Sequence, residues 1–408
     1  MNKLKPKYNA LAQWKLESLS LSAALLAIYS PLAFIMKKHI KKYLTALVGI
    51  LLSGCSNGQT TDAINGIRIS NNGINQEQSE LLFDNAKSFP NKTQLSIAII
   101  KNGEIEVVGI ERINDTIKLI ENNKNTFEIG SITKVFTSTL LSNFIKDQKL
   151  KLNDNIQDYL DFKINSKNKI TFKELANHTS GLPRLPSNLN LLLVDQNNPY
   201  KDYDEEKIIQ YLTKEIELKQ EPGTKYEYSN LGAGILGFEL ASISKSSYES
   251  LLQENIFKKY KMLNSTSKKD KIKSKLTKGL NPNGEVTSNW DFDALAGGGA
   301  IFSTIEDLSK FALAQFDNEN KELTLTQKPT FKVNDNMSIG LGWHILKRKN
   351  GGKLIWHNGG TGGYTSSMAL DLENKNGIII LSNVSAFNKK MGDIDQLCFG
   401  LINILDEK

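Results

Sequence analysis

Alternating apolar and polar residues, the pattern of β-strands, occur near both ends of the chain, with a long stretch lacking this pattern between them. Residues 93–108 alternate on either side of Asn102-Gly103, which predicts a β-hairpin. Near the other end, strand patterns cover residues 342–347, 353–356, 365–372 and 377–382, with a hairpin turn at 374–377 and a helix from about 390 to 405. We therefore predict an α+β fold in which one antiparallel sheet, built from both ends of the chain, is flanked by helices. Residues 91–130 and 301–408 would form the sheet domain, and residues 131–300 a mainly helical domain.

The N-terminal segment carries a targeting pattern. Residues 36–54 combine a basic start, a short apolar run and the ending Leu-Ser-Gly before Cys55, which resembles a bacterial lipoprotein signal peptide with a lipidated cysteine. Met36 is then the true start and residues 1–35 are an upstream extension, although the apolar stretch 19–35 leaves an uncleaved membrane hairpin open. Residues 55–90 would be the lipidated cysteine and a polar tether. We expect a lipid-anchored protein on the periplasmic or extracellular face of a bacterial cell envelope.

The charge distribution argues against nucleic acid as a partner. The chain has 408 residues with 51 basic and 44 acidic side chains, a net charge of +7. Eight of the lysines and one glutamate precede Cys55, which accounts for the whole excess and leaves the rest of the chain neutral.

Cysteine and histidine usage gives no sign of a disulfide or a metal site. Cys398, the one other cysteine, lies in an apolar run and is expected to be a buried core thiol. The histidines are scattered along the sequence, at positions 39, 178, 344 and 357. We predict no metal and no cofactor.

Ser131-x-x-Lys134 is the most informative chemical motif. Apolar residues at helical spacing follow it, so the pair is expected in the first turn of a helix, where positions i and i+3 share a face. A desolvated lysine can take the proton of a serine and make it a nucleophile. The same spacing recurs at Ser166/Lys169, Ser242/Lys245 and Ser265/Lys268, and a serine beside a solvated lysine is the alternative interpretation.

Tyr228-x-Asn230 forms a second cluster. A phenolate near a lysine ammonium can act as a general base, and an asparagine amide can orient a substrate carbonyl. A core tyrosine in a turn is the alternative. The pattern Gly232-x-Gly234-x-x-Gly237 follows directly, but no buried strand precedes it, so we interpret these glycines as close helix packing and not as a dinucleotide site.

The third cluster is a strand that enters a glycine-rich bend at residues 355–364. Glycines there let backbone N–H groups approach a ligand, which suits one half of an oxyanion hole. His357 could bind a substrate oxygen or assist proton transfer, and a hydrogen-bonded structural histidine is the alternative.

Taken together, Ser131-x-x-Lys134, Tyr228-x-Asn230 and His357-x-Gly359 occur in the order found in the penicillin-recognising serine hydrolases. The chain resembles most closely the class C β-lactamases and their relatives, the D-alanyl-D-alanine carboxypeptidases and β-lactamase-like esterases. Supporting similarity lies at residues 175–183, 221–223 and 296–304, and the resemblance covers about residues 90–400.

The resemblance implies a β-lactamase/DD-peptidase-like fold and acyl-enzyme chemistry. Ser131 would attack a lactam, amide or ester carbonyl, and Lys134 and Tyr228 would carry its proton to the leaving group. The backbone N–H groups of Ser131 and Gly360 would hold the oxyanion, and Asn230, His357 and Gly359 would bind the substrate. The substrate would be a β-lactam or a D-Ala-D-Ala-type peptide derived from peptidoglycan; the alternatives are an esterase on small acyl esters and a non-catalytic peptidoglycan-binding module.

Two positions depart from the family pattern. Typical β-lactamases have Lys-Thr-Gly as the third motif, and its cation helps to hold the substrate carboxylate. Here the motif begins with His357, and a histidine of pKa about 6.5 is mostly neutral at pH 7, so carboxylate recognition is expected to be weaker. Thr133 stands where class C enzymes usually carry Ser or Ala, and it is small enough to fit.

Overall fold

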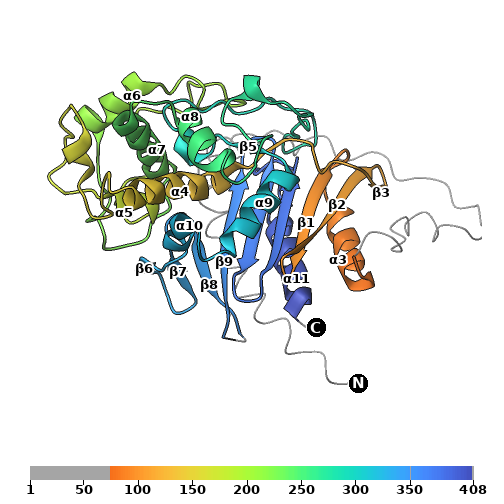
Figure 1. Cartoon of the computed structure of the whole chain (residues 1–408). Coiled ribbons are helices and arrows are strands. Elements are labelled where there is room, and N and C mark those ends of the chain that lie inside the picture. The colour runs from red at the N-terminus through yellow and green to blue at the C-terminus, as the bar shows by residue number, and fades with distance from the viewer. Residues whose placement is uncertain (1–73, 350, 407–408) are drawn as a thin grey trace, which may run out of the picture. The chain divides into compact units, whose positions relative to one another are not determined.

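The structure is a computed structural model that describes residues 74–349 and 351–406 (Figure 1). The chain divides into two units, Met1–Asn65 and Gly66–Lys408, and all described residues belong to the second. The predicted signal peptide, Cys55 and the start of the predicted tether lie outside the described residues. Among the described helices, none combines the length and apolar character needed to cross a membrane.

A nine-stranded sheet organises the second unit, and every neighbouring pair in it is antiparallel. The strand order is β3-β2-β1-β11-β10-β9-β8-β7-β6. β1 pairs with β11, with Ile97 opposite Ile380, so segments from the two ends of the chain meet in the middle of the sheet. The predicted antiparallel sheet is confirmed. Its strands are β1 Gln94–Lys101, β2 Glu104–Ile113, β3 Thr116–Leu119, β6 Phe331–Lys332, β7 Met337–Ile339, β8 His344–Lys347, β9 Lys353–Gly360, β10 Thr365–Asp371 and β11 Asn376–Ser382.

Both faces of the sheet are covered because its central strands are apolar on both sides. In β1, Ile97 and Ile99 belong to one buried cluster, and Ala98 and Ile100 belong to the other. Since successive side chains point to opposite faces, one strand contributes to two cores. The first core lies under α3 (Gln76–Ala86) and α11 (Gly392–Asp406), and the second lies under α9 (Ile305–Gln315) (Figure 1).

The segment between β3 and α9 combines several helices with longer stretches that have no regular secondary structure, and it lies beside the sheet (Figure 1). It is therefore less helical than predicted. A two-stranded pair, β4 (Phe127–Glu128) with β5 (Phe302–Ser303), joins the start of this segment to its end. The helices here are α4 Thr133–Lys146, α5 Phe172–Ala176, α6 Glu205–Gln210, α7 Asn230–Ser244 and α8 Tyr248–Leu252, and α10 Lys321–Thr326 packs against α4. α4 is buried on nearly all sides, so it forms the centre of this part of the molecule.

One of the two predicted hairpin turns lies where it was expected, and the other does not. Asn102 and Gly103 both have positive φ, 53° and 84°, and connect β1 to β2 as predicted. The second predicted turn is wrong in position: Asn376 and Gly377 already pair within β11, and the left-handed residue is Lys375 with φ 52°. Packing of the apolar run 378–381 on both faces of the sheet fixes the register of β11 and so moves the turn.

The predicted tether extends too far. Residues 76–86 form α3, whose first turn is closed by a capping box between Asn75 and Gln78. Leu82 and Ala86 face inward and join the core cluster that contains Leu397 and Leu401 of α11. The polar composition of the segment conceals this short apolar stripe, and the part of the predicted tether from Gln76 onward belongs to the folded unit.

Glu239 in α7 gives the fold a pH-dependent weakness. Its side chain is buried, and neither carboxyl oxygen has a hydrogen-bond partner among the described residues. Burial raises the pKa of this carboxyl to about 8. Because the folded-state pKa lies above the unfolded value, the stability linked to this group is complete below the ordinary glutamate pKa of 4.5 and is lost as pH rises through about 8.

We predict that Glu239→Gln makes folding less sensitive to pH, since the amide has no charged form. From about pH 5 to about pH 9, the unfolding free energy of the wild type should fall more than that of the variant, by on the order of 3 kcal/mol. Denaturant titrations at both pH values measure this. Replacing the exposed Glu254 by glutamine is the matched control and should leave the pH dependence of the wild type unchanged. Equal pH dependence in Glu239→Gln and the wild type would contradict the prediction.

Candidate active site

Ser131 and Lys134 lie in adjoining turns at the base of α4. Ser131 belongs to a 3-10 turn, Gly130–Ile132, and Lys134 is the second residue of α4. The expected single α-helical turn is therefore wrong in detail. A 3-10 turn has three residues, so side chains three apart still align, and Lys134 Nζ lies 2.9 Å from Ser131 Oγ. Ser131 is partly exposed, whereas Lys134 is 2 % exposed.

Lys134 is a buried amine without an acidic partner. Its Nζ donates to the carbonyl oxygen of Gly298 at 2.6 Å, and among the described residues no carboxylate pairs with it. Burial, with the positive charge of Arg184 as a second cause, lowers the pKa of Lys134 well below its ordinary value. A neutral amine at 2.9 Å can accept the hydroxyl proton of Ser131.

Glycines bring the carbonyl of Gly298 to Lys134. The 3-10 turn Ala296–Gly298 packs on α7 so closely that a Cβ on Gly237 would lie 2.8 Å from the Cα of Gly297. The same turn is tied to α4, since Thr137 Oγ1 donates to the Gly297 carbonyl at 2.8 Å. The interpretation of Gly237 as a packing glycine is supported, and so is that of Gly234, where a Cβ would lie 2.5 Å from Leu295 Cδ2.

Thr133, which stands where class C enzymes usually carry Ser or Ala, makes a hydrogen bond within this packed region. Its hydroxyl accepts a hydrogen bond from the backbone N–H of Ile301 at 3.1 Å, and the side chain is fully buried. A serine could make the same bond, so the threonine keeps the connection between α4 and the segment after the glycine turn.

Tyr228 lies directly before α7, with Ser229 as the N-cap of that helix. Lys134 Nζ is 4.9 Å from the centre of its ring, and its hydroxyl is hydrogen-bonded to Ser131. Burial raises the pKa of Tyr228 to about 12, although the bond to Ser131 and the charge of Arg184 act in the opposite direction. The group is thus a phenol at neutral pH, in contrast to the predicted phenolate, which makes it a proton donor.

Asn230 is the first residue of α7. Its backbone N–H donates to the carbonyl of Arg184 at 3.0 Å, which ties the helix to the loop after α5. Its Oδ1 is buried and has no partner among the described residues, so it is an acceptor available to a ligand.

The end of β9 lies backbone-to-backbone on the turn that carries Ser131. A Cβ on Gly359 would collide with the carbonyl of Ile129 and lie 2.8 Å from Ser131 N. A Cβ on Gly130 would lie 2.5 Å from the backbone nitrogen of Gly360. Only glycine permits this approach, and it brings the Gly360 and Ser131 segments together, where the sequence predicts an oxyanion hole.

His357 is 1 % exposed and is held neutral. Its Nδ1 lies 2.6 Å from the carbonyl of Asn358, and because a carbonyl only accepts, Nδ1 carries the proton. Burial lowers the pKa of His357 well below its usual value, with His344 and Lys134 as further causes. The remaining nitrogen, Nε2, is then an acceptor, so this histidine supplies neither a cation nor a donor from Nε2.

The three described histidines, scattered in the sequence, gather around the site in the structure. His178 accepts from the backbone N–H of Ser229 at 3.2 Å and lies with its ring centre 4.4 Å from that of Tyr228. The Tyr226 hydroxyl bonds His344 Nε2 at 3.0 Å, and the His344 and His357 rings are 5.2 Å apart. His178 had a signal, since it lies in the segment 175–183 that supports the resemblance. Within the described part of the chain, no group of three or more His, Cys, Asp or Glu side chains could hold a metal ion.

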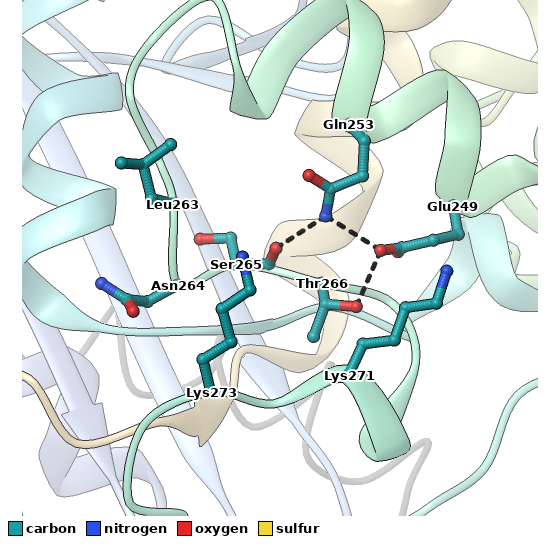
Figure 2. Close-up of a pocket in the computed structure, with 8 residues that line it drawn as sticks. All are labelled: Glu249, Gln253, Leu263, Asn264, Ser265, Thr266, Lys271 and Lys273. Atoms are coloured by element: carbon teal, nitrogen blue, oxygen red, sulfur yellow. Dashed lines mark hydrogen bonds between the residues drawn. The ribbon is translucent and has the colours of Figure 1, made fainter.

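A separate cavity of about 300 Å³ lies beside α8 (Figure 2). The Glu249 carboxylate there accepts from Gln253 at 2.9 Å and from Thr266 at 2.8 Å, so its charge is satisfied. Ser265, which shares the Ser-x-x-Lys spacing, is bonded to Asp307 at 3.0 Å. We place the candidate chemistry at Ser131 and not in this cavity, because the cavity is lined by none of the residues around Ser131 described above. The lining residues are Glu249, Gln253, Leu263, Asn264, Ser265, Thr266, Lys271 and Lys273.

Comparison with known proteins decides the family. The sequence model of the beta-lactamase family matches residues 92–397. The chain belongs to the beta-lactamase family. Members of this family are generally hydrolases, and the matched range contains Ser131, Lys134, Tyr228 and His357.

Curated relatives are distant and longer. "Protein flp" of Staphylococcus aureus strain MW2 is 26 % identical over 311 residues, covering 71 % of this chain and 59 % of that protein. "Beta-lactamase-like protein 4" of Dictyostelium discoideum is 30 % identical over 347 residues, covering 76 % of this chain and 58 % of that protein. The chain thus spans about three fifths of the length of these relatives.

Solved structures agree on the fold. The octameric penicillin-binding protein homologue from Pyrococcus abyssi has a TM-score of 0.67 at 22 % identity, covering 81 % of this chain and 77 % of that one. A β-lactamase/D-alanine carboxypeptidase from Pseudomonas syringae has a TM-score of 0.67 at 18 % identity, covering 80 % of this chain and 98 % of that one. At these identities the likeness shows a shared β-lactamase/DD-peptidase fold.

We predict that Gly359→Ala displaces β9 from the turn that carries Ser131, because the added Cβ would meet the Ile129 carbonyl and Ser131 N. The midpoint of thermal unfolding should fall, with a loss of about 1–3 kcal/mol of stability, and labelling of Ser131 by an acylating probe should slow. Gly392→Ala is the control, since a Cβ there meets nothing within 4 Å. Unchanged stability and unchanged labelling of Gly359→Ala would contradict this packing.

Proposed function

We propose that this protein is a serine hydrolase that forms an acyl-enzyme at Ser131 and hydrolyses a β-lactam or a D-Ala-D-Ala-type peptide. The observation that carries the proposal is the 2.9 Å contact between Ser131 Oγ and the amine of Lys134, whose pKa burial lowers. The family match supports hydrolase chemistry, and the Pseudomonas syringae protein of the same fold is described as a β-lactamase/D-alanine carboxypeptidase.

The first half-reaction forms the acyl-enzyme. Neutral Lys134 accepts the hydroxyl proton as Ser131 Oγ bonds to the carbonyl carbon. The backbone N–H groups of Ser131 and Gly360 receive the negative charge on the carbonyl oxygen. When the bond to the leaving group breaks, the Tyr228 phenol donates a proton to that group and recovers one from the Lys134 ammonium, 4.9 Å from its ring centre.

The second half-reaction reverses these proton transfers. A water molecule attacks the acyl carbon and gives its proton to the amine of Lys134, the bond to Ser131 Oγ breaks, and the serine recovers its proton. Asn230 Oδ1, unpartnered among the described residues, would accept from an amide N–H of the substrate.

An esterase on small acyl esters is the second candidate, and one observation favours it. His357 occupies the place of the lysine in the Lys-Thr-Gly motif and is neutral and buried, so the end of β9 at the site offers no cation to a substrate carboxylate. A small neutral ester needs no such cation.

Attachment to a membrane remains part of the proposal. We propose that Cys55 is lipidated and holds the enzyme at the periplasmic or extracellular face of the cell envelope, where peptidoglycan-derived substrates occur. Mass spectrometry of the mature N-terminus of protein isolated from bacterial membranes tests this, and an unmodified Cys55 or a retained Met36 would count against it.

We predict that a fluorescent penicillin labels the purified protein covalently and that Ser131→Ala abolishes this labelling. A chromogenic cephalosporin, a D-Ala-D-Ala peptide and p-nitrophenyl acetate should include at least one substrate, with turnover reduced at least about 10³-fold in the variant. Ser242→Ala is the matched control, because this exposed serine has the same Ser-x-x-Lys spacing. Absence of labelling together with absence of turnover of all three compounds would reject the hydrolase function.

We also predict the pH dependence of acylation. Acylation requires the neutral amine of Lys134, so its rate should fall as pH drops through the lowered pKa of this group. The rate should reach its plateau well below pH 10.5, the ordinary value for lysine. Stopped-flow measurements of acylation over this range test it; a rate that keeps rising until about pH 10.5 would mean that Lys134 titrates as an exposed lysine.

A further inference from the structure

Arg184 is a cation at the candidate site with no acidic partner. It follows Pro183 at the end of the segment 175–183. Its guanidinium forms no ion pair with a described residue and lies over the Tyr228 ring, 5.2 Å from the ring centre. The other described arginines are satisfied: Arg112 donates to the carbonyl of Asn114 at 3.0 Å, and Arg348 pairs with Asp371 at 3.1 Å.

The backbone around Arg184 is fixed, while its side chain is partly exposed. The Arg184 carbonyl accepts from the N–H groups of Asn230 and Leu231 at 3.0 and 3.1 Å, so the loop is tied to the start of α7. The charge lies close to the reacting groups, because the Tyr228 ring that it contacts at 5.2 Å is also 4.9 Å from Lys134 Nζ. It is a cause that acts to lower the pKa values of Lys134, His178 and Tyr228. A partly exposed cation held beside a nucleophile is in a position to meet a substrate.

We propose that Arg184 binds a carboxylate group of the substrate. This inference rests on the proposed function, since it requires a substrate at Ser131. A guanidinium offers a rigid fork of donors that matches the two oxygens of a carboxylate. His357 is neutral and cannot provide that charge from β9, so the cation comes instead from the loop between α5 and α6.

The choice of arginine at this position is consistent with such a role. Only four of the 51 basic residues are arginines, at positions 68, 112, 184 and 348, so lysine is the usual cation of this chain. Without a counter-ion, Arg184 repels the protonated form of Lys134. A substrate carboxylate would neutralise Arg184 and remove this repulsion.

Two pairs of esters test the proposal. Mono-p-nitrophenyl glutarate and p-nitrophenyl valerate share the length of the acyl chain and differ in a carboxylate on the acyl side. 4-Acetoxybenzoate and its methyl ester differ in a carboxylate on the leaving group. For each pair, the ratio of kcat/KM of the charged to the neutral ester is measured in the wild type, in Arg184→Gln and in Arg184→Lys.

We expect Arg184→Gln to lower this ratio on the order of 10- to 100-fold in at least one pair, with a partial loss in Arg184→Lys. The pair that responds identifies the side of the substrate that carries the carboxylate. The exposed Lys225, in the segment just before Tyr228, provides the matched control: Lys225→Gln removes the same charge and should leave both ratios unchanged.

The outcomes distinguish a failure of carboxylate binding by Arg184 from a failure of the proposed hydrolase function. If Arg184→Gln and Arg184→Lys change the charged and neutral esters by equal factors, Arg184 acts only through Tyr228 and Lys134, and carboxylate binding is rejected. If the wild type turns over none of the four esters and is not labelled by the fluorescent penicillin, the proposed function fails, and this inference fails with it. Turnover of the neutral esters by each variant shows that it is folded.

Discussion

The burial of one amine without an acidic partner is the constraint on which the candidate site depends. Lys134 is 2 % exposed, and an ammonium in that position would normally require a carboxylate. Its neighbours are instead the Gly298 carbonyl, the Ser131 hydroxyl and the Tyr228 ring. None of these stabilises a full positive charge as a carboxylate does, so the neutral amine is favoured.

Other titratable groups near the amine are held in uncharged forms for the same reason. Burial raises the pKa of the Tyr228 phenol and lowers the pKa values of His178, His344 and His357, so all four are neutral near pH 7. In a buried surrounding with few charged groups, each remaining electrostatic interaction, including that of Arg184 with Lys134, is stronger than in water. In the proposed mechanism, the amine of Lys134 accepts the proton of Ser131, and the Tyr228 phenol donates a proton to the leaving group.

Much of the fold follows from the sequence because strand alternation and the Asn102-Gly103 turn are local signals. The gathering of His178, His344 and His357 is not local: it depends on pairing of β8 with β9 and on the turn before α7, which no spacing in the sequence reveals. The three motifs predicted at the site do lie together, while their roles remain predictions. Arg184 was missed because a lone arginine in a loop carries no periodic pattern. Its contact with Tyr228 depends on the hydrogen bonds that tie the start of α7 to the Arg184 carbonyl, and these join segments far apart in the sequence.

The neutral His357 and the cation Arg184 are related, because two positive charges this close to Lys134 would repel each other. Arg184 already lowers the pKa of Lys134, and His357 lies in the same buried group, 6.2 Å from Tyr228 between ring centres. A lysine at position 357 would place a second positive charge beside the Tyr228 ring, where Arg184 already lies, without a carboxylate among the described residues to offset the repulsion between the two cations. A cation on β9 and one on the loop after α5 would therefore compete. In this chain the cation lies on the loop, so a substrate carboxylate would be recognised from the helical side of Ser131.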